Sequence, residues 1–144
     1  MVSFEGFRAV DGVPIYLQIQ TYVRRGCVAG TIRDGDELPS RRVLSALLGV
    51  NPNTVQKAFR LLEDEGLIES RSGAKSYVRL NPAKAGALRA ELLRDDVRSV
   101  TRTLKQLGIP MATAIDMYLR QITLTGGIPF PLSLPKAPTA LNAD

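Results

Sequence analysis

The chain has 144 residues, of which 44% are hydrophobic, and its 19 basic and 14 acidic residues give a net charge of +5. This length suits one modest domain with an appendage and excludes a second, large ligand-binding domain. With no histidine and one cysteine, Cys27, the chain lacks the commonest acid–base catalyst and metal ligand and cannot form an intramolecular disulfide, so neither an enzyme nor a cofactor is expected.

The N-terminal residues 1–13 are predicted to form an arm that packs on the first helix. The apolar side chains available for this contact are those of Phe4, Phe7 and Val10. Pro14 can begin the helix, because the N–H that proline lacks is unused in the first turn, and Gly30 can end it. The apolar stripe of this helix consists of Ile15, Ile19, Tyr22 and Val23. Arg24 and Arg25 are interpreted as a solvated face, with a position next to DNA phosphates as the alternative.

Residues 34–49 predict a turn, a short strand and a helix. Asp34-Gly35-Asp36 is a turn signal that leads into a strand at Leu38, which could pair with a later hairpin. Ser40 is placed to cap a helix that ends at Gly49. The apolar residues of this helix, expected to form one buried face, are Val43, Leu44, Leu47 and Leu48.

A second helix follows after one intervening residue. Asn51 is a good N-cap, and Pro52 fits the first helical position. The residues expected to be buried recur at helical spacing and are Val55, Ala58, Phe59 and Leu62, whereas the outward face carries Asn53, Thr54, Gln56, Lys57 and Arg60. Two helices joined by so short a turn form a helix-turn-helix, whose second helix offers its first side chains to the DNA major groove.

A hairpin is predicted from strands at 67–70 and 76–78 around a turn at Ser72-Gly73, with Gly66 ending the preceding helix. Next to a helix-turn-helix, such a hairpin is a wing. Residues 38–62 contain four basic residues and no acid, and residues 70–90 contain five basic residues and no acid. Positive charge in both places suits a phosphate backbone and makes four cations candidates for DNA contact: Arg41, Lys57, Arg71 and Lys75.

Two further helices are predicted after Asn81. The first runs from Pro82 to about Gln106, and the second follows Gly108 and Pro110 and ends at Thr125. Apolar residues at spacings of 4, 3, 4 and 3 form a seam on the long helix: Leu93, Val97, Val100, Leu104 and Leu107. The apolar residues of the last helix are Met111, Ile115, Leu119 and Ile122.

This seam is too narrow to form an independent core. We therefore expect the seam, together with Ile115, Leu119 and Ile122, to be buried against a second copy of the chain in a homodimer. The alternative is that both helices fold back on the first domain of the same chain. The predicted organisation is thus a DNA-binding domain at 1–80, a helical dimerisation region at 81–125, and a tail at 126–144.

The tail contains two glycines and four prolines and is predicted to be irregular. The longest uncharged run, residues 121–135, is interrupted by three prolines and two glycines, so it is a poor membrane helix. No charged-then-apolar leader follows Met1. A cytoplasmic location is expected.

Three stretches resemble the winged-helix domain of GntR-type bacterial transcription regulators. They are PIYLQIQ from Pro14, GDELPSRRVLSALLGVNPNTVQKAFRLLEDEGLI from Gly35, and RSGAKSYV from Arg71. The short chain and the NPNT sequence point to the YtrA-type branch. The resemblance covers residues 7–80 in detail and the later helices in length and character only. It implies a mainly α fold with a small β-hairpin, in which a winged helix-turn-helix is followed by a two-helix C-terminal dimerisation extension.

The resemblance also implies which positions contact DNA: Ser40, Arg42, Asn51, Asn53, Thr54, Gln56, Ser72 and Gly73. Arginine can pair with guanine, asparagine and glutamine with adenine, and hydroxyls with phosphates. Asn51 and Thr54 could instead serve only the helix start, and Lys57 could lie on a solvated face. This chain has Lys75 where the family usually has a second wing glycine, so its wing contact is expected to differ.

These features predict a cytoplasmic, nucleoid-associated transcription regulator, a repressor that binds an inverted-repeat operator as a homodimer. A non-specific architectural DNA binder and a winged-helix protein-interaction module are the alternatives. The resemblance implies a response to a small molecule or to cell-envelope stress, and no residue of the chain identifies such an effector.

Overall fold

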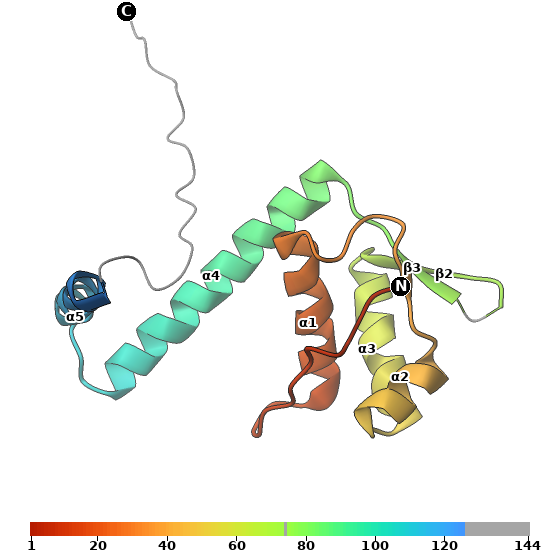
Figure 1. Cartoon of the computed structure of the whole chain (residues 1–144), viewed down its shortest axis with the longest axis horizontal. Helices are drawn as coiled ribbons and strands as arrows, with labels where there is room; N and C mark the ends of the chain where they lie inside the picture. Colours follow the sequence, from red (N-terminus) through yellow and green to blue (C-terminus); the bar gives the residue numbers. More distant parts are fainter. Residues whose placement is uncertain (74, 126–144) are drawn as a thin grey trace, which may run out of the picture. The chain divides into compact units, whose positions relative to one another are not determined.

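The computed structural model describes residues 1–73 and 75–125, with side chains described as far as Arg120. Within these residues, five helices and three short strands follow one another (Figure 1): α1 (Ile15–Ala29), β1 (Glu37–Leu38), α2 (Arg41–Leu48), α3 (Pro52–Asp64), β2 (Ile68–Arg71), β3 (Lys75–Val78), α4 (Pro82–Gln106) and α5 (Met111–Thr125). The predicted fold class is therefore confirmed. The chain divides into two compact units, Met1–Asp95 and a second that begins at Asp96, which are described separately.

The N-terminal arm is built into the first unit through its aromatic residues. The Phe4 ring stacks on Tyr22 of α1 with a centroid separation of 5.0 Å, and Phe7 meets the same ring edge-on at 5.7 Å. The prediction that the arm packs on the first helix is confirmed, although the Val10 side chain is 59% exposed and does not contribute to the buried contact. Gln18 of α1 holds the backbone of Val10, because its side-chain amide bonds both the N–H and the C=O of that residue at 2.9 Å.

The helix-turn-helix begins and ends at the predicted capping residues. Ser40 Oγ accepts a hydrogen bond from the Val43 N–H at 3.2 Å, and Gly49 ends α2 with a φ of 65°. Asn51 caps α3, and Pro52 is its first residue. The four residues predicted to be buried along α3 are buried, namely Val55, Ala58, Phe59 and Leu62. These residues form the centre of the first unit's core.

The predicted apolar face of α2 is wrong in part. Leu44 is buried, but Val43 and Leu47 are 56% and 57% exposed. Each residue is rotated by about 100° about the helix axis, so Leu44, Ser45 and Leu48 lie on one side of α2. Val43 and Leu47 point away from that side. The buried Ser45 is accommodated because its hydroxyl donates to the Val50 carbonyl at 2.6 Å.

The three strands form one antiparallel sheet in the order β1-β3-β2. Leu38 lies opposite Ser76, and Ile68 lies opposite Val78, so the predicted pairing of the Leu38 strand with the hairpin is confirmed. Leu38, Ile68 and Val78 are buried. The sheet therefore covers one side of the helical core and extends the β2–β3 hairpin beyond it (Figure 1).

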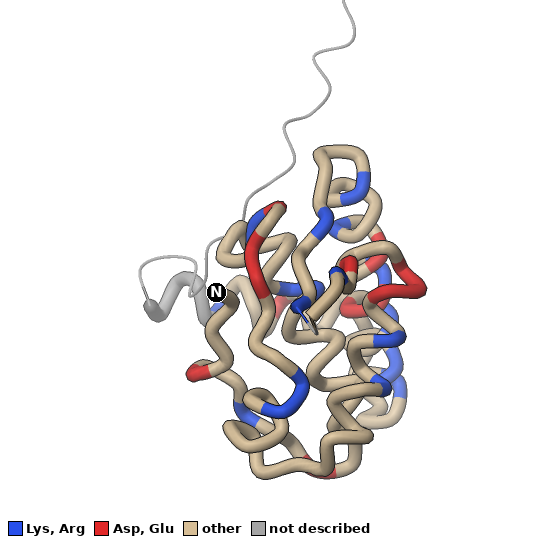
Figure 2. The backbone as a smooth tube through the Cα atoms, turned by 90° about the vertical axis from the view of Figure 1, so that its right-hand side faces the viewer, with Lys and Arg blue, Asp and Glu red and all other residues tan. Residues whose placement is uncertain are grey.

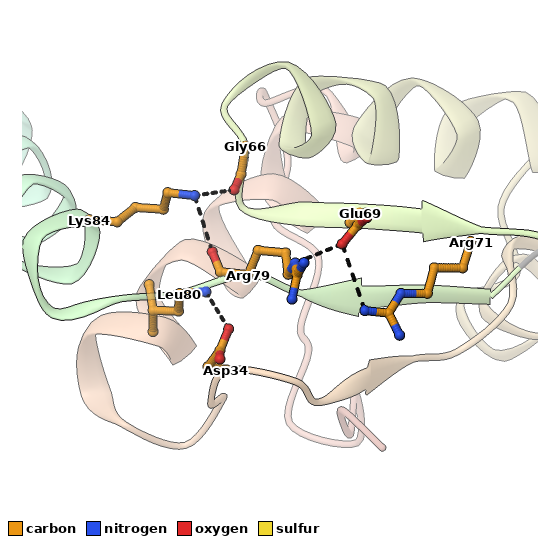
Figure 3. A network of polar contacts seen from close by, with 7 residues as sticks. All are labelled: Asp34, Gly66, Glu69, Arg71, Arg79, Leu80 and Lys84. Carbon is orange, nitrogen blue, oxygen red and sulfur yellow. Dashed lines mark hydrogen bonds and ion pairs between the residues drawn. The ribbon is translucent and has the colours of Figure 1, made fainter.

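The first unit continues past Leu80 because the start of α4 packs on it. Leu88 and Leu92 are 5% and 8% exposed and belong to the same core as α1 and α3. Figure 3 shows the polar contacts at this junction, where Asp34 accepts a hydrogen bond from the Leu80 N–H at 2.7 Å and Lys84 Nζ donates to the carbonyl of Gly66. The predicted helix from Pro82 to Gln106 is confirmed.

The remainder of α4 and the last helix carry exposed apolar residues. Leu93, Val97, Val100 and Leu107 are 55–66% exposed, Leu104 is half-buried, and Ile115 and Leu119 on α5 are 53% and 54% exposed. Gly108 ends α4 with a φ of 68°, and α5 begins after Pro110, as predicted. The side chain of Ile122 and the predicted tail at 126–144 lie outside the described residues.

Candidate nucleic-acid interface

The first turn of α3 lies at the surface and carries Asn53. Asn51 Oδ1 accepts a hydrogen bond from the Asn53 N–H at 2.8 Å, which satisfies one of the unpaired amides at the helix start. Asn51, Pro52 and Asn53 are all exposed. Among the described residues, nothing forms a hydrogen bond with the Asn53 side-chain amide. Asn53 therefore offers an outward donor and acceptor, which is the pair that an adenine edge requires.

The other predicted polar residues of α3 are less accessible than Asn53. Thr54 and Gln56 are half-buried, and the Thr54 N–H bonds the Asn51 carbonyl at 2.9 Å. Lys57 is exposed, but its ammonium lies 3.9 Å from the centroid of the Tyr16 ring of α1. A cation over an aromatic face is held in place by the ring's negative face. Lys57 is therefore positioned at the side of α3 that borders α1.

The two adjacent arginines of α2 have different surroundings. The Arg41 guanidinium lies 5.8 Å from the centroid of the Phe59 ring, and its Nη2 is 3.9 Å from Glu63 Oε1. Arg42 is exposed, and the described part of the chain provides no ion-pair partner for it. One residue is a rotation of about 100° on a helix, which turns Arg41 towards α3 and Arg42 away from it. Arg42 is consequently the α2 cation available to a ligand.

Ser40 has a structural role at the start of α2. Its half-buried hydroxyl oxygen accepts the capping hydrogen bond from Val43. A hydroxyl can accept and donate at once, so its hydrogen remains able to reach a phosphate. The cap and the predicted backbone contact are therefore compatible.

The basic residues of the wing are paired with carboxylates. Lys75 Nζ lies 3.4 Å from Glu37 Oε1, and Arg79 Nε lies 2.6 Å from Glu69 Oε2. The Arg71 guanidinium lies 5.1 Å from the Tyr77 ring centroid and 4.0 Å from the same Glu69 oxygen (Figure 3). Ser72 and Gly73 at the hairpin turn are exposed. The wing thus presents cations whose charge is partly compensated.

These ion pairs join a basic segment of the sequence to acidic segments. Figure 2 shows the acidic residues in red, some of them close together along the chain, and the sequence has two short acidic runs at 34–37 and 63–65. The basic wing lacks acids of its own between 70 and 90, but β3 pairs with β1 and so meets Glu37. The local sequence does not indicate this compensation, because Glu37 and Lys75 are 38 residues apart.

Arg24 was not expected to have a structural partner, and the interpretation of it as solvated is wrong. Its side chain is only 12% exposed, with Nε 3.2 Å from Glu65 Oε2 and Nη2 2.9 Å from Glu91 Oε1. Gln20, one turn earlier on α1, also donates a hydrogen bond to Glu65. No local pattern marks this arrangement, because its members lie on three helices.

Cys27 is buried on α1, and its environment disfavours the thiolate. Burial, with a smaller effect of the nearby Asp36 carboxylate, raises the pKa of Cys27 from 9.0 to about 11.

Across the described residues, no group of three or more cysteine, aspartate or glutamate side chains could hold a metal ion. Within those same residues, no helix combines the length and apolar character that crossing a bilayer would require.

Comparison with known proteins identifies the family. Residues 15–78 match the family described as bacterial regulatory proteins, gntR family. The chain is 37% identical over 97 residues to the HTH-type transcriptional repressor YtrA of Bacillus subtilis, covering 67% of this chain and 70% of that protein. It is 31% identical over 96 residues to the transcriptional regulator YhcF of the same organism, covering 67% and 79%.

A solved structure supports the same relationship. The GntR family transcriptional regulator from Listeria monocytogenes is 29% identical to the chain and superimposes with a TM-score of 0.67, covering 78% of this chain and 98% of that one. These relatives are all named as transcriptional regulators, which confirms the predictions of a DNA-binding regulator and of a chain that is not an enzyme. The chain belongs to the GntR family and is a winged helix-turn-helix DNA-binding transcription regulator of YtrA type.

Proposed function

We propose that the chain is a cytoplasmic repressor that binds an inverted-repeat operator as a homodimer. The outward first turn of α3 is the single observation on which base recognition rests. Asn53 is exposed there with its amide available, and Arg42 of α2 is exposed without an ion-pair partner among the described residues. Arg42 would read guanine and Asn53 adenine, through bidentate contacts in the major groove.

Contacts to the phosphate backbone would position this pair. The residues assigned to the backbone and to the groove edge are Ser40, Arg41, Asn51, Thr54, Gln56 and Lys57 of the helix-turn-helix, and Arg71, Ser72, Gly73 and Lys75 of the wing. Such contacts orient a protein on the duplex without specifying its sequence. Arg41, Arg71 and Lys75 each have a carboxylate within 4.0 Å, so their contribution requires an exchange of a glutamate for a phosphate.

The dimer would form through the seam of α4 together with α5. Val97, Val100 and Leu107 of the second unit expose more than half of their side chains to solvent, as do Ile115 and Leu119. Burial of apolar surface is worth roughly 25 cal/mol per Å², so a second copy that covers these residues would stabilise the pair. A twofold dimer presents two recognition helices, and therefore predicts an operator with two inverted half-sites.

The assignment as a repressor rests on the relative from Bacillus subtilis that carries this word in its name. A dimer bound across a promoter excludes polymerase by occupying the DNA, and this action needs no further chemistry from the protein. An effector, if the chain binds one, would act by changing the separation of the two recognition helices.

Selection of bound duplexes from a random DNA pool tests the proposal. The full chain is mixed with the pool, bound duplexes are sequenced, and the mass of the complex gives the number of protein copies per duplex. An enriched palindrome that carries two copies supports the proposal. Binding without enrichment and with a steep salt dependence indicates an architectural DNA binder, and an absence of binding indicates a protein-interaction module. Either of these two results contradicts the proposal.

A further inference from the structure

Glu63 lies where the recognition helix α3 ends and the wing begins. The Gly66 N–H donates to the Glu63 carbonyl at 2.9 Å, and Gly66 has a φ of 71°, so the chain reverses directly after α3. The returning strand β2 brings Ser70 beside the last turn of α3, and the Ser70 hydroxyl donates a hydrogen bond to Glu63 Oε1. The Glu63 side chain thus joins the helix-turn-helix to the first strand of the wing.

This contact continues into the second strand of the wing. Ser70 lies opposite Ser76, and their hydroxyl oxygens are 3.2 Å apart. Ser76 is 3% exposed, and a buried hydroxyl needs a partner inside the protein. Because a hydroxyl can donate and accept at once, Ser70 can accept from Ser76 while it donates to Glu63. A chain of hydrogen bonds therefore runs from α3 across both strands of the wing.

The same carboxylate also faces α2. Phe59 and Glu63 are one turn apart on α3, and Arg41 of α2 lies beside both of them. Its guanidinium carbon is 5.8 Å from the centroid of the Phe59 ring, and its Nη2 is 3.9 Å from Glu63 Oε1. Glu63 Oε1 therefore has two partners, one from the wing and one from α2. All of these residues belong to the first unit, Met1–Asp95.

We propose that Glu63 is a positioning residue that fixes the wing against the recognition helix, so that the wing and the base-reading residues reach one duplex together. The hydrogen bonds of the sheet hold its strands to one another, and the apolar packing of Ile68 and Val78 on the core is weakly directional. The hydrogen bond from Ser70 to Glu63 is directional and links the sheet to α3. A wing already held at the right angle loses less freedom on binding, which favours its contact with phosphates. This role rests on the wing contact proposed above and not on the dimer.

The test asks whether the contribution of the wing to DNA affinity depends on Glu63. This contribution is the loss of affinity caused by Lys75→Ala, measured for the full chain on one fixed duplex. It is determined in the wild type, in Glu63→Ala, which removes the acceptor, and in Glu63→Gln, which keeps an oxygen acceptor for Ser70. Asp64→Ala is the matched control, because it removes an exposed carboxylate from the adjacent residue, which forms no ion pair within the described residues.

The effect of Lys75→Ala should depend on whether the acceptor at residue 63 is present. Lys75→Ala should weaken binding by about three- to fivefold in the wild type, in Glu63→Gln and in Asp64→Ala, but by less than about twofold in Glu63→Ala. The loss caused by Asn53→Ala should be the same in all of these backgrounds, whereas a general loss of stability would reduce both contributions. Ser70→Ala removes the same hydrogen bond without a change in charge, so it should behave like Glu63→Ala and supplies the comparison should Glu63→Ala not fold.

Three results would overturn the proposal. If Lys75→Ala weakens binding as much in folded Glu63→Ala or Ser70→Ala as in the wild type, Glu63 does not position the wing, and the wing contact itself stands. If Glu63→Gln behaves like Glu63→Ala, the charge of Glu63 rather than its hydrogen bond with Ser70 is responsible. If Lys75→Ala has no effect in the wild type, the proposed wing contact fails, and the role of Glu63 fails with it.

Discussion

The ammonium of Lys75 on the wing lies 3.4 Å from the carboxylate of Glu37 on β1, the strand that pairs with it. This glutamate compensates the charge of a cation that we propose to contact phosphates. An exposed pair of this kind is worth up to about 1 kcal/mol. In the proposed complex, the Lys75 ammonium therefore has two competing partners, the Glu37 carboxylate and a DNA phosphate.

Removing the carboxylate should strengthen DNA binding. We expect Glu37→Gln to raise affinity by about two- to fivefold on specific and random DNA alike, because Lys75 then has no competing partner and a repulsive charge is lost. Lys75→Ala should weaken binding to both and reduce the salt slope by about one. Titrations at several salt concentrations measure both effects. Glu5→Gln, on the arm, changes the net charge by the same amount and is the control. An equal gain in DNA affinity for Glu5→Gln would show that net charge alone, and not the pairing of Lys75, causes the effect.

Replacing the proposed base readers should affect specific binding most. Asn53→Ala and Arg42→Ala should each lose roughly 1–3 kcal/mol on the selected operator and much less on random DNA. Both side chains are exposed, so folding should be unaffected. Competition between operator and random duplex gives the ratio directly. Equal losses on both DNAs would remove these residues from base recognition and leave them as backbone contacts.

A charge in the seam should dissociate the dimer. Val100 is 57% exposed in the described chain, so Val100→Asp is tolerated by a monomer but would place a carboxylate in a dimer interface. Sedimentation should show half the wild-type mass, and operator affinity should fall while the circular dichroism spectrum is kept. Ser99→Asp, on the same helix but about 100° round from Val100, is the control. If the mass is unchanged in Val100→Asp, the seam is not the dimer contact.

Cys27 should react slowly with alkylating reagents in the native protein. Its pKa of about 11, against an ordinary 9.0, lowers the thiolate fraction at pH 8 about a hundredfold, since each pKa unit is a factor of ten. Because the folded-state pKa is the higher one, the associated stability is complete below pH 9 and is lost as the pH rises towards 11. Mass spectrometry of iodoacetamide-treated native and denatured protein checks the rate. Equal rates would show that the thiol is accessible.

Local signals explain why much of the fold can be predicted from sequence. Ser40 and Asn51 start α2 and α3, and Gly49 ends α2, because caps depend on residues within one turn. The burial of Val55 and Phe59 could be predicted because α3 has 13 residues, over which the apolar residues recur at helical spacing and define one side. On α2, with only eight residues, the apolar positions do not define a side, and this is why Val43 and Leu47 are misassigned.

Contacts between distant segments could not be predicted in the same way. Arg24 with Glu65 and Glu91, and Lys75 with Glu37, depend on which helices and strands become neighbours. Leu88 and Leu92 could be recognised as apolar but not assigned to the first core, because the seam begins one residue later on the same helix. The DNA-contact and dimerisation assignments remain predictions until binding is measured.

The arm has a practical consequence for protein production. Val2 and Phe4 are 5% and 3% exposed, and the Val2 N–H donates to the Glu37 carbonyl at 2.7 Å. Met1 is 80% exposed, so a purification handle can begin there without displacing a packed side chain. A bulky fusion joined without a spacer would pull on the chain that holds β1, and with it on Glu37 beside the wing. Binding constants should therefore be measured after an N-terminal handle has been cleaved.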